Sequence, residues 1–431
     1  MNILVIGGGG REHALVWKLR QGEGVTSVTC APGNAGIAKE ATCVPIAPTD
    51  IDACLAFARE KEIGLTVVGP EAPLVAGIVD RFTGAGIPII GPDRAAAQLE
   101  GSKAFTKKIL AEAGVPTAAF EIFDNPAEAL KALDGKSYPL VVKADGLAAG
   151  KGVLIVKDEE EARDAIRTIM EEKAFGEAGD RVVLEDFLRG EEASFIVLTD
   201  GETILPLASS QDHKAIHDGD RGPNTGGMGA YSPAPVVDAA MHDRVMRTVI
   251  EPVIETMNKR GTPYRGILYA GLMISGDTPY VLEFNVRMGD PETQPILFRM
   301  AGDLVEAFMY LHEGRLHKAN LGWSPDPALC VVLASKGYPG KYEKGKVIHG
   351  LESLEGRRDL KVFHAGTKRQ NGHIVTNGGR VLGVTAIDST LAACREKAYK
   401  AIEAIHFDGM TYRKDIGLKG IQRETPSGGT P

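Results

Sequence analysis

The sequence predicts a protein of several domains with α/β and α+β folds, beginning with an open parallel sheet. Its 431 residues exceed what one hydrophobic core usually serves, so more than one domain is expected. In the first hundred residues, strand-like apolar runs alternate with helix-like segments, as in a parallel sheet covered by helices. After residue 322 the pattern changes to short strands and turns, which indicates a C-terminal lobe of mixed α/β structure.

The first domain, residues 1–102, is expected to alternate strands and helices. Apolar runs predict strands at Asn2–Ile6, Val25–Thr29, Leu65–Val68 and Pro88–Ile90. Helical spacing predicts helices at Arg11–Arg20, Ile51–Lys61 and Pro73–Thr83. Ligands of such sheets bind at the carboxyl ends of the strands. We therefore expect a binding site at the segments 7–10, 31–36 and 69–73.

Two further parts are expected before the C-terminal lobe, a small α+β unit at 103–190 and a larger sheet at 191–322. The first begins with a helix, Ser102–Ala113, that ends at Gly114. Its other elements are strands at Pro139–Lys143, Gly152–Val156 and Arg181–Phe187, and a helix at Asp158–Glu172. The larger part carries helices at Ala239–Lys259 and Asp303–Glu313. The C-terminal lobe, 323–424, has a helix near Leu391–Ile405, and a tail of no assigned function follows at 425–431.

Composition favours a cytoplasmic enzyme that acts on small molecules. A net charge of -8 argues against a nucleic-acid partner. No apolar run approaches the roughly 20 residues that span a bilayer, and the start does not resemble a signal peptide. The five cysteines are scattered and form no CxxC pair, which favours reduced thiols. We expect no membrane partner and a monomer or weak homodimer.

The run "GGGGREH" follows the first predicted strand and invites comparison with dinucleotide-binding loops. The G-x-G-x-x-G pattern fails, because Glu12 or His13 stands where the third glycine belongs. The loop can still present the backbone N–H groups of Gly9 and Gly10 to an anion at a helix start. An ordinary tight turn from strand to helix explains the run equally well, so both interpretations stay open.

The run "KADGLAAGKGV", which begins at Lys143, joins two predicted strands. It is not a Walker loop, because three residues separate Gly146 from Gly150 and Lys151 is followed by Gly152. Its small residues allow the backbone to approach phosphate oxygens, and its lysines supply positive charge. We expect a lid over a triphosphate, although a flexible hairpin would explain the run if it stood alone.

Two later runs place oxygen-bearing side chains near strand ends. In "VLEDFLRGEE", Glu185, Asp186 and Glu191 surround Leu188, a set that suits an adenine edge and a ribose diol but also occurs on ordinary surfaces. In "LEFNVRMGDPETQ", Glu283 and Asn285 lie two residues apart and so share one face of a strand. A carboxylate and an amide oxygen suit Mg²⁺. The alternative for this pair is the polar face of a surface strand.

Taken in order, Lys103, Lys143, the glycine loop, "LEDFLRGEE" and "LEFNVRMGDPE" resemble the ATP-grasp carboxylate–amine ligases. The long run "SSQDHKAIHDGDRGPNTGGMGAYSP", with "ILVIGGGGREHAL" and "GPEAPL", is similar to the phosphoribosylamine–glycine ligase family of purine biosynthesis. The resemblance extends from Met1 to about His406. It implies an N-terminal parallel-sheet domain, an ATP-grasp domain with a small lid, and a C-terminal lobe.

The resemblance also implies the reaction. ATP phosphorylates the carboxylate of glycine, and the amine of 5-phosphoribosylamine attacks the acyl phosphate to give glycinamide ribonucleotide, ADP and phosphate. ATP is then a co-substrate, and Mg²⁺ or Mn²⁺ is the metal. Such a transfer between anions needs charge neutralisation and positioning more than covalent help from the protein.

By resemblance, the metal is bound by Glu283 and Asn285. The catalytic residues are Lys143, Asp212, Lys214 and Arg287. The nucleotide is bound by Lys103, Lys143, Gly146, Gly150, Lys151, Gly152, Glu185, Asp186, Leu188 and Glu191. The substrates are bound by Gly9, Gly10, Glu71, Asp212, His213, Lys214, Asn224, Gly227, Met228, Gly229, Arg287, Gly289, Pro291 and Glu292. A purely structural role for His213 is an equal alternative.

Two departures from the family pattern concern charge. The strand before the metal pair, Gly266–Ser275, carries no carboxylate, so phosphates and water are expected to complete the metal shell. After Lys214, Ala215 and Ile216 stand where a basic residue is expected, and Arg221 is the substitute.

Three alternatives compete with this function. Another purine-pathway ATP-grasp ligase is disfavoured by the run from Asp212 to Pro233, and a nicotinamide-dependent oxidoreductase by the broken glycine pattern. A nucleotide-binding regulatory protein without catalysis would not need both Glu283 and Asn285.

Overall fold

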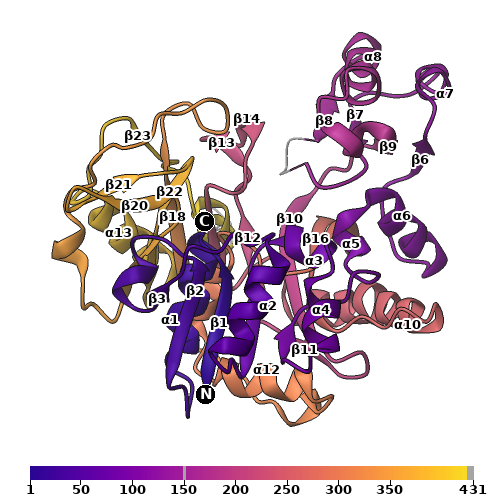
Figure 1. The fold of residues 1–431 in the computed structure, drawn as a ribbon. Coiled ribbons are helices and arrows are strands. Elements are labelled where there is room, and N and C mark those ends of the chain that lie inside the picture. Colours follow the sequence, from indigo (N-terminus) through magenta and orange to yellow (C-terminus); the bar gives the residue numbers. More distant parts are fainter. Residues whose placement is uncertain (149–151, 425–431) are drawn as a thin grey trace, which may run out of the picture.

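The computed structural model describes residues 1–148 and 152–424 and confirms the predicted fold class (Figure 1). The N-terminal sheet is parallel throughout, in the order β3-β2-β1-β4-β5. Its strands are β1 (Asn2–Gly7), β2 (Ser27–Pro32), β3 (Thr42–Cys43), β4 (Leu65–Val68) and β5 (Ile89–Ile90). Because β1 lies at the centre, its glycine-rich end meets the ends of both neighbouring strands.

The helices of this domain differ from the prediction at one place. The predicted helix Pro73–Thr83 is wrong as a single element, because the chain forms α3 (Glu71–Val75) and α4 (Ile78–Gly84). Gly77 between them has φ +92°, a left-handed conformation that ends the first helix. The other elements are α1 (Gly10–Leu19), the 3₁₀ turn Ile37–Lys39 and α2 (Ile51–Glu60).

A small antiparallel sheet, β6-β9-β7-β8, forms the predicted lid unit. Its strands are β6 (Phe120–Phe123), β7 (Leu140–Ala144), β8 (Val153–Val156) and β9 (Val182–Asp186). Its helices are α7 (Pro126–Lys131), α8 (Glu159–Ile166), which continues as a π-helix (Arg167–Glu171), and the 3₁₀ helix Gly176–Asp180. It is reached through α5 (Gln98–Gly101) and α6 (Lys103–Glu112). Gly150 and Lys151, both predicted to bind phosphate, lie outside the described residues.

The central sheet is antiparallel, in the order β11-β10-β16-β17. Its strands are β10 (Glu191–Thr199), β11 (Ile204–Pro206), β16 (Gly266–Ser275) and β17 (Thr278–Asn285). The predicted long helix consists of α9 (Ala239–Val245), a π-helical turn (Met246–Ile250) and α10 (Glu251–Lys259). After β17 come α11 (Thr293–Arg299), α12 (Leu304–His312) and the 3₁₀ turn Leu316–Lys318. A short hairpin, β13 (Ala215–His217) and β14 (Arg221–Asn224), projects toward the same end of the molecule as the lid (Figure 1).

The sheet of the C-terminal lobe has the order β12-β15-β18-β22-β19, with β23 paired to β18. Its strands are β12 (Gln211–Asp212), β15 (Gly229–Ser232), β18 (Ala328–Ser335), β19 (Leu360–His364), β22 (Arg380–Ile387) and β23 (Met410–Thr411). The rest comprises the 3₁₀ turn Leu351–Leu354, the hairpin β20 (Thr367–Gln370) and β21 (His373–Thr376), α13 (Leu391–Ile402) and α14 (Leu418–Glu424). Two strands of this sheet thus come from the middle of the chain, which brings Asp212 against the C-terminal lobe.

The buried apolar clusters join parts of the chain that are separate in the sequence. One core joins the N-terminal sheet to the central sheet, with Leu4 and Phe82 from the first and Phe195 and Leu272 from the second. The lid has a core of its own around Val142. The lid is therefore the part that shares least apolar contact with the rest. No helix within the described residues is long and apolar enough to cross a membrane.

Candidate active site

Glu283 and Asn285, the predicted metal ligands and here called the metal pair, lie at the end of β17. Gly271 of β16 pairs with Glu283 and, lacking a side chain, leaves the carboxylate uncovered. The side chain of Glu283 is 39% exposed, whereas Asn285 is buried. Burial raises the pKa of Glu283, but Lys214, Lys143 and Lys103 outweigh it and hold the pKa below its ordinary value. The carboxylate is therefore ionised and accessible.

A lysine cluster, Lys103, Lys143 and Lys214, surrounds this carboxylate. Lys214 Nζ lies 3.6 Å from a Glu283 oxygen and 3.2 Å from Glu192. Lys103 donates to the carbonyl of Gly146 at 2.9 Å, which places it under the lid, and burial lowers its pKa. Three cations around one uncovered carboxylate suit a metal-bound triphosphate. The fold brings these three predicted residues together from three separate segments of the chain.

Glu185, predicted to contact adenine, lies at the end of β9 and is bound to lysines instead of facing solvent. One of its oxygens, Oε2, lies 2.9 Å from Lys143 and 3.0 Å from Lys107. Its other oxygen, Oε1, is buried and has no partner among the described residues, so it can still accept from a ligand. Burial lowers the pKa of Lys107 to about 8 although Glu185 opposes the shift. Sequence reasoning missed Lys107, which stands one helical turn after Lys103.

The remaining predicted nucleotide contacts are less enclosed. Asp186 is exposed and Leu188 half-buried, and Glu191 forms an ion pair with Arg423 of the C-terminal helix α14. Gly146 and Gly152 have little free space, because a Cβ would lie 2.9 Å from Ala178 and 2.7 Å from Ala148, respectively.

Arg287 is held between two glutamates of the N-terminal domain. Its Nη2 donates to Glu100 at 2.8 Å and its Nε to Glu71 at 3.3 Å. Burial raises the pKa of Glu100 to about 7. Burial also acts to raise the pKa of Glu71, but Arg287 and Arg11 outweigh it and lower that pKa. Glu100, which also accepts from the Val286 N–H at 2.7 Å, was missed by sequence reasoning because no motif marks it.

The segment Asp212–Lys214 enters the site from the edge of the C-terminal sheet. Burial, with the added charge of Glu292, raises the pKa of Asp212 well above its ordinary value. Glu292 is buried and accepts from Tyr269 at 2.6 Å. Burial and the negative charge of Glu292 together make the carboxyl group of Asp212 harder to ionise than an exposed one.

His213 is buried and neutral at neutral pH. Its Nδ1 lies 3.2 Å from the carbonyl oxygen of Gly229, while Nε2 has no partner among the described residues. Burial lowers its pKa to about 4, with Arg413 and Lys419 contributing. Its structural and substrate-binding interpretations both remain compatible with this geometry.

Two tight turns, here called the acceptor turns, carry the predicted substrate contacts Gly227 and Pro291. They are Gly226–Gly227 and Asp290–Pro291. A Cβ on Gly227 (φ +107°) would lie 2.4 Å from Pro291 and 2.8 Å from Asp212, so only glycine allows this approach. Arg380, which sequence reasoning missed, lies 3.1 Å from an Asp290 carboxylate oxygen.

The flanking predicted residues are placed as follows. Met228 is fully buried and hydrogen-bonds through its backbone to His213 and Val332, and Gly229 begins β15. Asn224 is exposed at the end of β14. The Gly289 carbonyl accepts from the Thr293 N–H at the start of α11.

The glycine loop of the N-terminal domain faces the second acceptor turn. The Gly9 N–H already donates to the carboxylate of Glu12, which leaves fewer N–H groups for an anion. A Cβ on Gly9 would lie 3.4 Å from Asp290, and one on Gly10 would lie 2.6 Å from Gln294. The three domains therefore meet at the start of α1.

The residues present fit a hard cation that is shared with a nucleotide. Within the described part of the chain, no group of three or more His, Cys, Asp or Glu side chains is arranged to hold a metal. Glu283 and Asn285 supply two oxygens, and Mg²⁺ readily takes the rest of its shell from phosphates and water. A site of this kind is complete only with its nucleotide.

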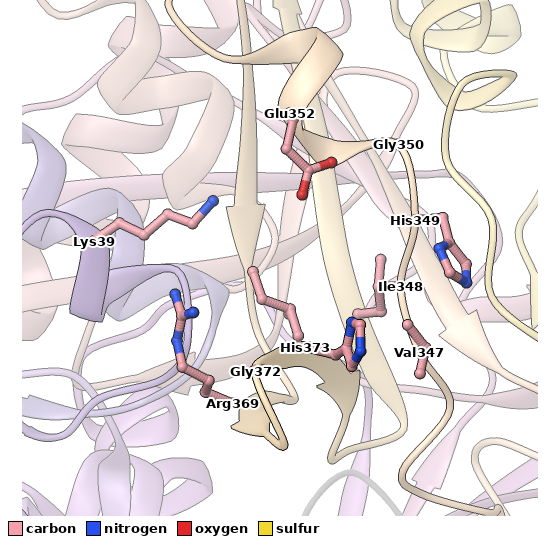
Figure 2. A pocket seen from close by; sticks show the side chains of 10 residues that line it. Lys39, Val347, Ile348, His349, Gly350, Glu352, Arg369, Gly372 and His373 are labelled. Atoms are coloured by element: carbon pink, nitrogen blue, oxygen red, sulfur yellow. The ribbon is translucent and has the colours of Figure 1, made fainter.

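A separate polar pocket of about 200 Å³ opens in the C-terminal lobe (Figure 2). Lys39 and Arg369 lie on one side of it and His349 and His373 on the other. None of the predicted site residues lines it.

A nucleotide-accessible metal pair, a lysine cluster and a lid built on a separate sheet define an ATP-grasp protein. Domain models of phosphoribosylglycinamide synthetase match residues 1–100 (N domain), 101–293 (ATP-grasp domain) and 328–419 (C domain). The chain belongs to the phosphoribosylglycinamide synthetase family.

Individual relatives agree over the full length. The chain is 55% identical to the phosphoribosylamine–glycine ligase of Vibrio cholerae and 56% identical to that of Yersinia pestis, covering 98% of this chain and 99% and 100% of theirs. The solved phosphoribosylamine–glycine ligase of Thermotoga maritima is 35% identical with a TM-score of 0.85, covering 96% of this chain and 100% of that one. A biotin carboxylase of Campylobacter jejuni, 17% identical with a TM-score of 0.75 over 99% of this chain and 95% of its own, shares the fold.

Proposed function

We propose that the chain ligates glycine to 5-phosphoribosylamine at the expense of ATP, with Mg²⁺ or Mn²⁺, in purine biosynthesis. The observation that carries this proposal is the convergence of the lysine cluster on the uncovered carboxylate of Glu283, in a chain matched over its full length by phosphoribosylamine–glycine ligases. The products are glycinamide ribonucleotide, ADP and phosphate.

The first half-reaction transfers the terminal phosphoryl group of ATP to a carboxylate oxygen of glycine. A bound Mg²⁺ at Glu283 and Asn285 would neutralise phosphate charge. Lys103 and Lys143 hold the phosphates on the lid side, and Lys214 stands beside the same carboxylate. Arg287, whose forked guanidinium binds oxyanions bidentately, is the proposed contact for the glycine carboxylate.

In the second half-reaction, the amine nitrogen attacks the acyl carbon, the C–N bond forms and phosphate leaves. The nitrogen must lose one proton. Asp212, whose pKa is raised by burial and by Glu292, is the group that we propose takes it. The ribosylamine is proposed to lie between the Gly9–Gly10 loop and the acceptor turns.

The test follows ADP release from the purified chain supplied with ATP, Mg²⁺, glycine and freshly generated phosphoribosylamine. Release should require both substrates, and Glu283→Ala should lower it by more than the roughly 10- to 100-fold that loss of an outer-shell metal partner costs. The matched control Glu255→Gln removes an exposed carboxylate whose one ion pair among the described residues is with Lys259. Equal ADP release without glycine would rule out the ligase reaction.

We propose that the protein is a monomer or weak homodimer and that it acts in the cytoplasm. We also propose domain bounds at residues 1–102, 103–190, 191–322 and 323–424. All five cysteines carry free thiols, which supports a reducing compartment. Sedimentation velocity across a range of concentrations measures the oligomeric state.

A further inference from the structure

Arg380 is the first residue of β22, and its guanidinium reaches out of the C-terminal lobe into the site. Its Nη1 donates to the carbonyl oxygen of Asp290 at 2.6 Å and to that of Gly226, and its Nη2 lies 3.1 Å from the Asp290 carboxylate. One side chain thus joins both acceptor turns, which lie more than sixty residues apart in the sequence.

The turns are shaped to receive this group. A Cβ on Gly226 would lie 2.9 Å from the Arg380 Cζ, so the backbone of the turn lies directly against the guanidinium. The Gly226 N–H donates to the hydroxyl of Tyr338, also from the C-terminal lobe, at 2.9 Å. Lysine has a single charged nitrogen and cannot span two carbonyls and a carboxylate in one plane.

The same contacts extend to the N-terminal domain. Asp290 accepts from Gln294 at 3.0 Å, and both side chains are among the groups that a Cβ on Gly10 would meet. Burial acts to raise the pKa of Asp290, but Arg380 outweighs it and keeps the carboxylate ionised. Arg380 therefore controls the position of a charged group that faces the glycine loop.

We propose that Arg380 is a positioning residue for the acceptor amine: it locks the acceptor turns together and so shapes the site for a phosphorylated ribosylamine. This inference rests on the proposed function. The hydrogen bonds of Arg380 go to the acceptor turns, whereas the nucleotide side is built by Lys103, Lys143 and the metal pair. Loss of Arg380 should therefore weaken the binding of the acceptor and leave the binding of ATP unchanged.

The experiment compares the full-length chain with Arg380→Met and Arg380→Lys by calorimetric titration with glycinamide ribonucleotide and, separately, with ATP and Mg²⁺. Both variants should bind glycinamide ribonucleotide at least about tenfold more weakly, the effect of truncating one partner of a buried charge pair. Their ATP affinity should stay within about twofold of wild type. The KM for phosphoribosylamine should rise in parallel while that for ATP does not.

Two further variants separate positioning from general destabilisation. In Gly226→Ala, the added methyl group should push the Arg380 guanidinium away from the turn. We expect the same selective loss of affinity for glycinamide ribonucleotide, and the losses of the two variants should not add in Gly226→Ala/Arg380→Met. Arg357→Met removes an exposed arginine of the same lobe that, within the part of the chain the structure describes, pairs with Asp359 alone, and we expect no change. Unchanged glycinamide ribonucleotide affinity in both Arg380 variants, or an equal loss of ATP affinity, overturns the inference. A wild-type chain that binds ATP but not glycinamide ribonucleotide overturns the proposed function instead.

Discussion

Glu71 and Glu100 contact the same arginine, yet their pKa values move in opposite directions. Both carboxylates are removed from water, which raises a pKa. For Glu71, the positive charges of Arg287 and Arg11 outweigh burial and lower the pKa. For Glu100, burial outweighs Arg287, and the negative charge of Glu71 raises the pKa further. Arg287 is thus held by one firmly ionised carboxylate and one that titrates near neutrality.

This difference predicts a pH dependence of stability. The pKa of Glu100 is about 7 in the folded chain and near 4.5 when unfolded, so the folded state binds more protons between these values and stability falls as pH rises through them. In Glu100→Gln, the free energy of unfolding relative to wild type should therefore increase from about pH 5 to about pH 7, by on the order of 1 kcal/mol or more. Urea unfolding at both pH values measures it.

Glu71→Gln is the matched control. Because its pKa is lowered, Glu71 is ionised in both states across this window, and its stabilising contribution is lost only as pH falls below the ordinary value. A flat difference for Glu100→Gln, or an equal slope in both variants, would contradict the assignment.

A second prediction concerns Lys107, which was not anticipated from the sequence. It shares the buried Glu185 with Lys143, and Lys107→Met leaves that carboxylate with one cation fewer. We expect destabilisation of more than about 1 kcal/mol but less than the roughly 3–5 kcal/mol of an unpaired buried charge, because Lys143 still pairs with Glu185. Lys136→Met, which breaks the more exposed pair with Glu121, should cost about 0–1 kcal/mol. Similar losses in the two variants, measured by urea unfolding, would show that Glu185 is not a buried partner.

The hairpin β13–β14 is held by the end of the chain and not by its neighbours in sequence. Arg413 is completely buried, donates to the Ala215 carbonyl at 3.0 Å and bonds both oxygens of Asp415. Asp220 at the hairpin tip accepts from the same guanidinium at 3.1 Å. Since the hairpin follows Lys214 directly, this contact fixes the segment next to the lysine that is proposed to be catalytic.

Arg413→Met should therefore loosen the hairpin. We expect a loss of about 3–5 kcal/mol in the free energy of unfolding, because the carboxylates around the arginine stay partly buried without a partner. Limited proteolysis should cut at residues 217–222 first, with Arg357→Met cleaved as slowly as wild type. Cleavage elsewhere in the Arg413 variant would place the effect outside the hairpin.

In the whole molecule, the proposed nucleotide site lies between two parts that have separate apolar cores. The N-terminal and central sheets share a core, whereas the lid packs around its own. The proposed phosphate contacts come from both, with Lys143 on the lid and Glu283 on the central sheet. ATP with its metal should therefore stabilise the arrangement of the two parts.

Mg²⁺-ATP at about 100 times its Kd should raise the free energy of unfolding by about 2.7 kcal/mol, visible as a higher Tm. Removing the metal with a chelator should abolish most of this gain, and Asn285→Ala should show little gain at any metal concentration. An equal gain with ATP alone would mean that the nucleotide binds without the metal pair.

Local patterns were sufficient for the fold class, for the strands of the N-terminal sheet and for several of the longer helices, and they also supplied the motif residues that stay predictions for the site. Alternation of apolar runs gives the parallel sheet, and the spacing of Glu283 and Asn285 places both on one face of a strand, because a strand repeats every two residues. Short helices such as α7 and α11 were not predicted, and the left-handed backbone of Gly77 splits one predicted helix into two.

Lys107, Glu100, Arg380 and Arg413 could not be found this way. Each acts through a partner that is distant in sequence: Arg380 bonds Asp290, and Arg413 bonds the hairpin almost two hundred residues earlier. Side-chain periodicity reports which face of an element is buried, but a buried charge is stabilised by whichever groups the packing of other elements brings within hydrogen-bond distance. The motif residues can be recognised from the sequence because their spacing reflects local geometry. The charged residues that hold them in place depend on how the domains pack, which the sequence pattern does not show.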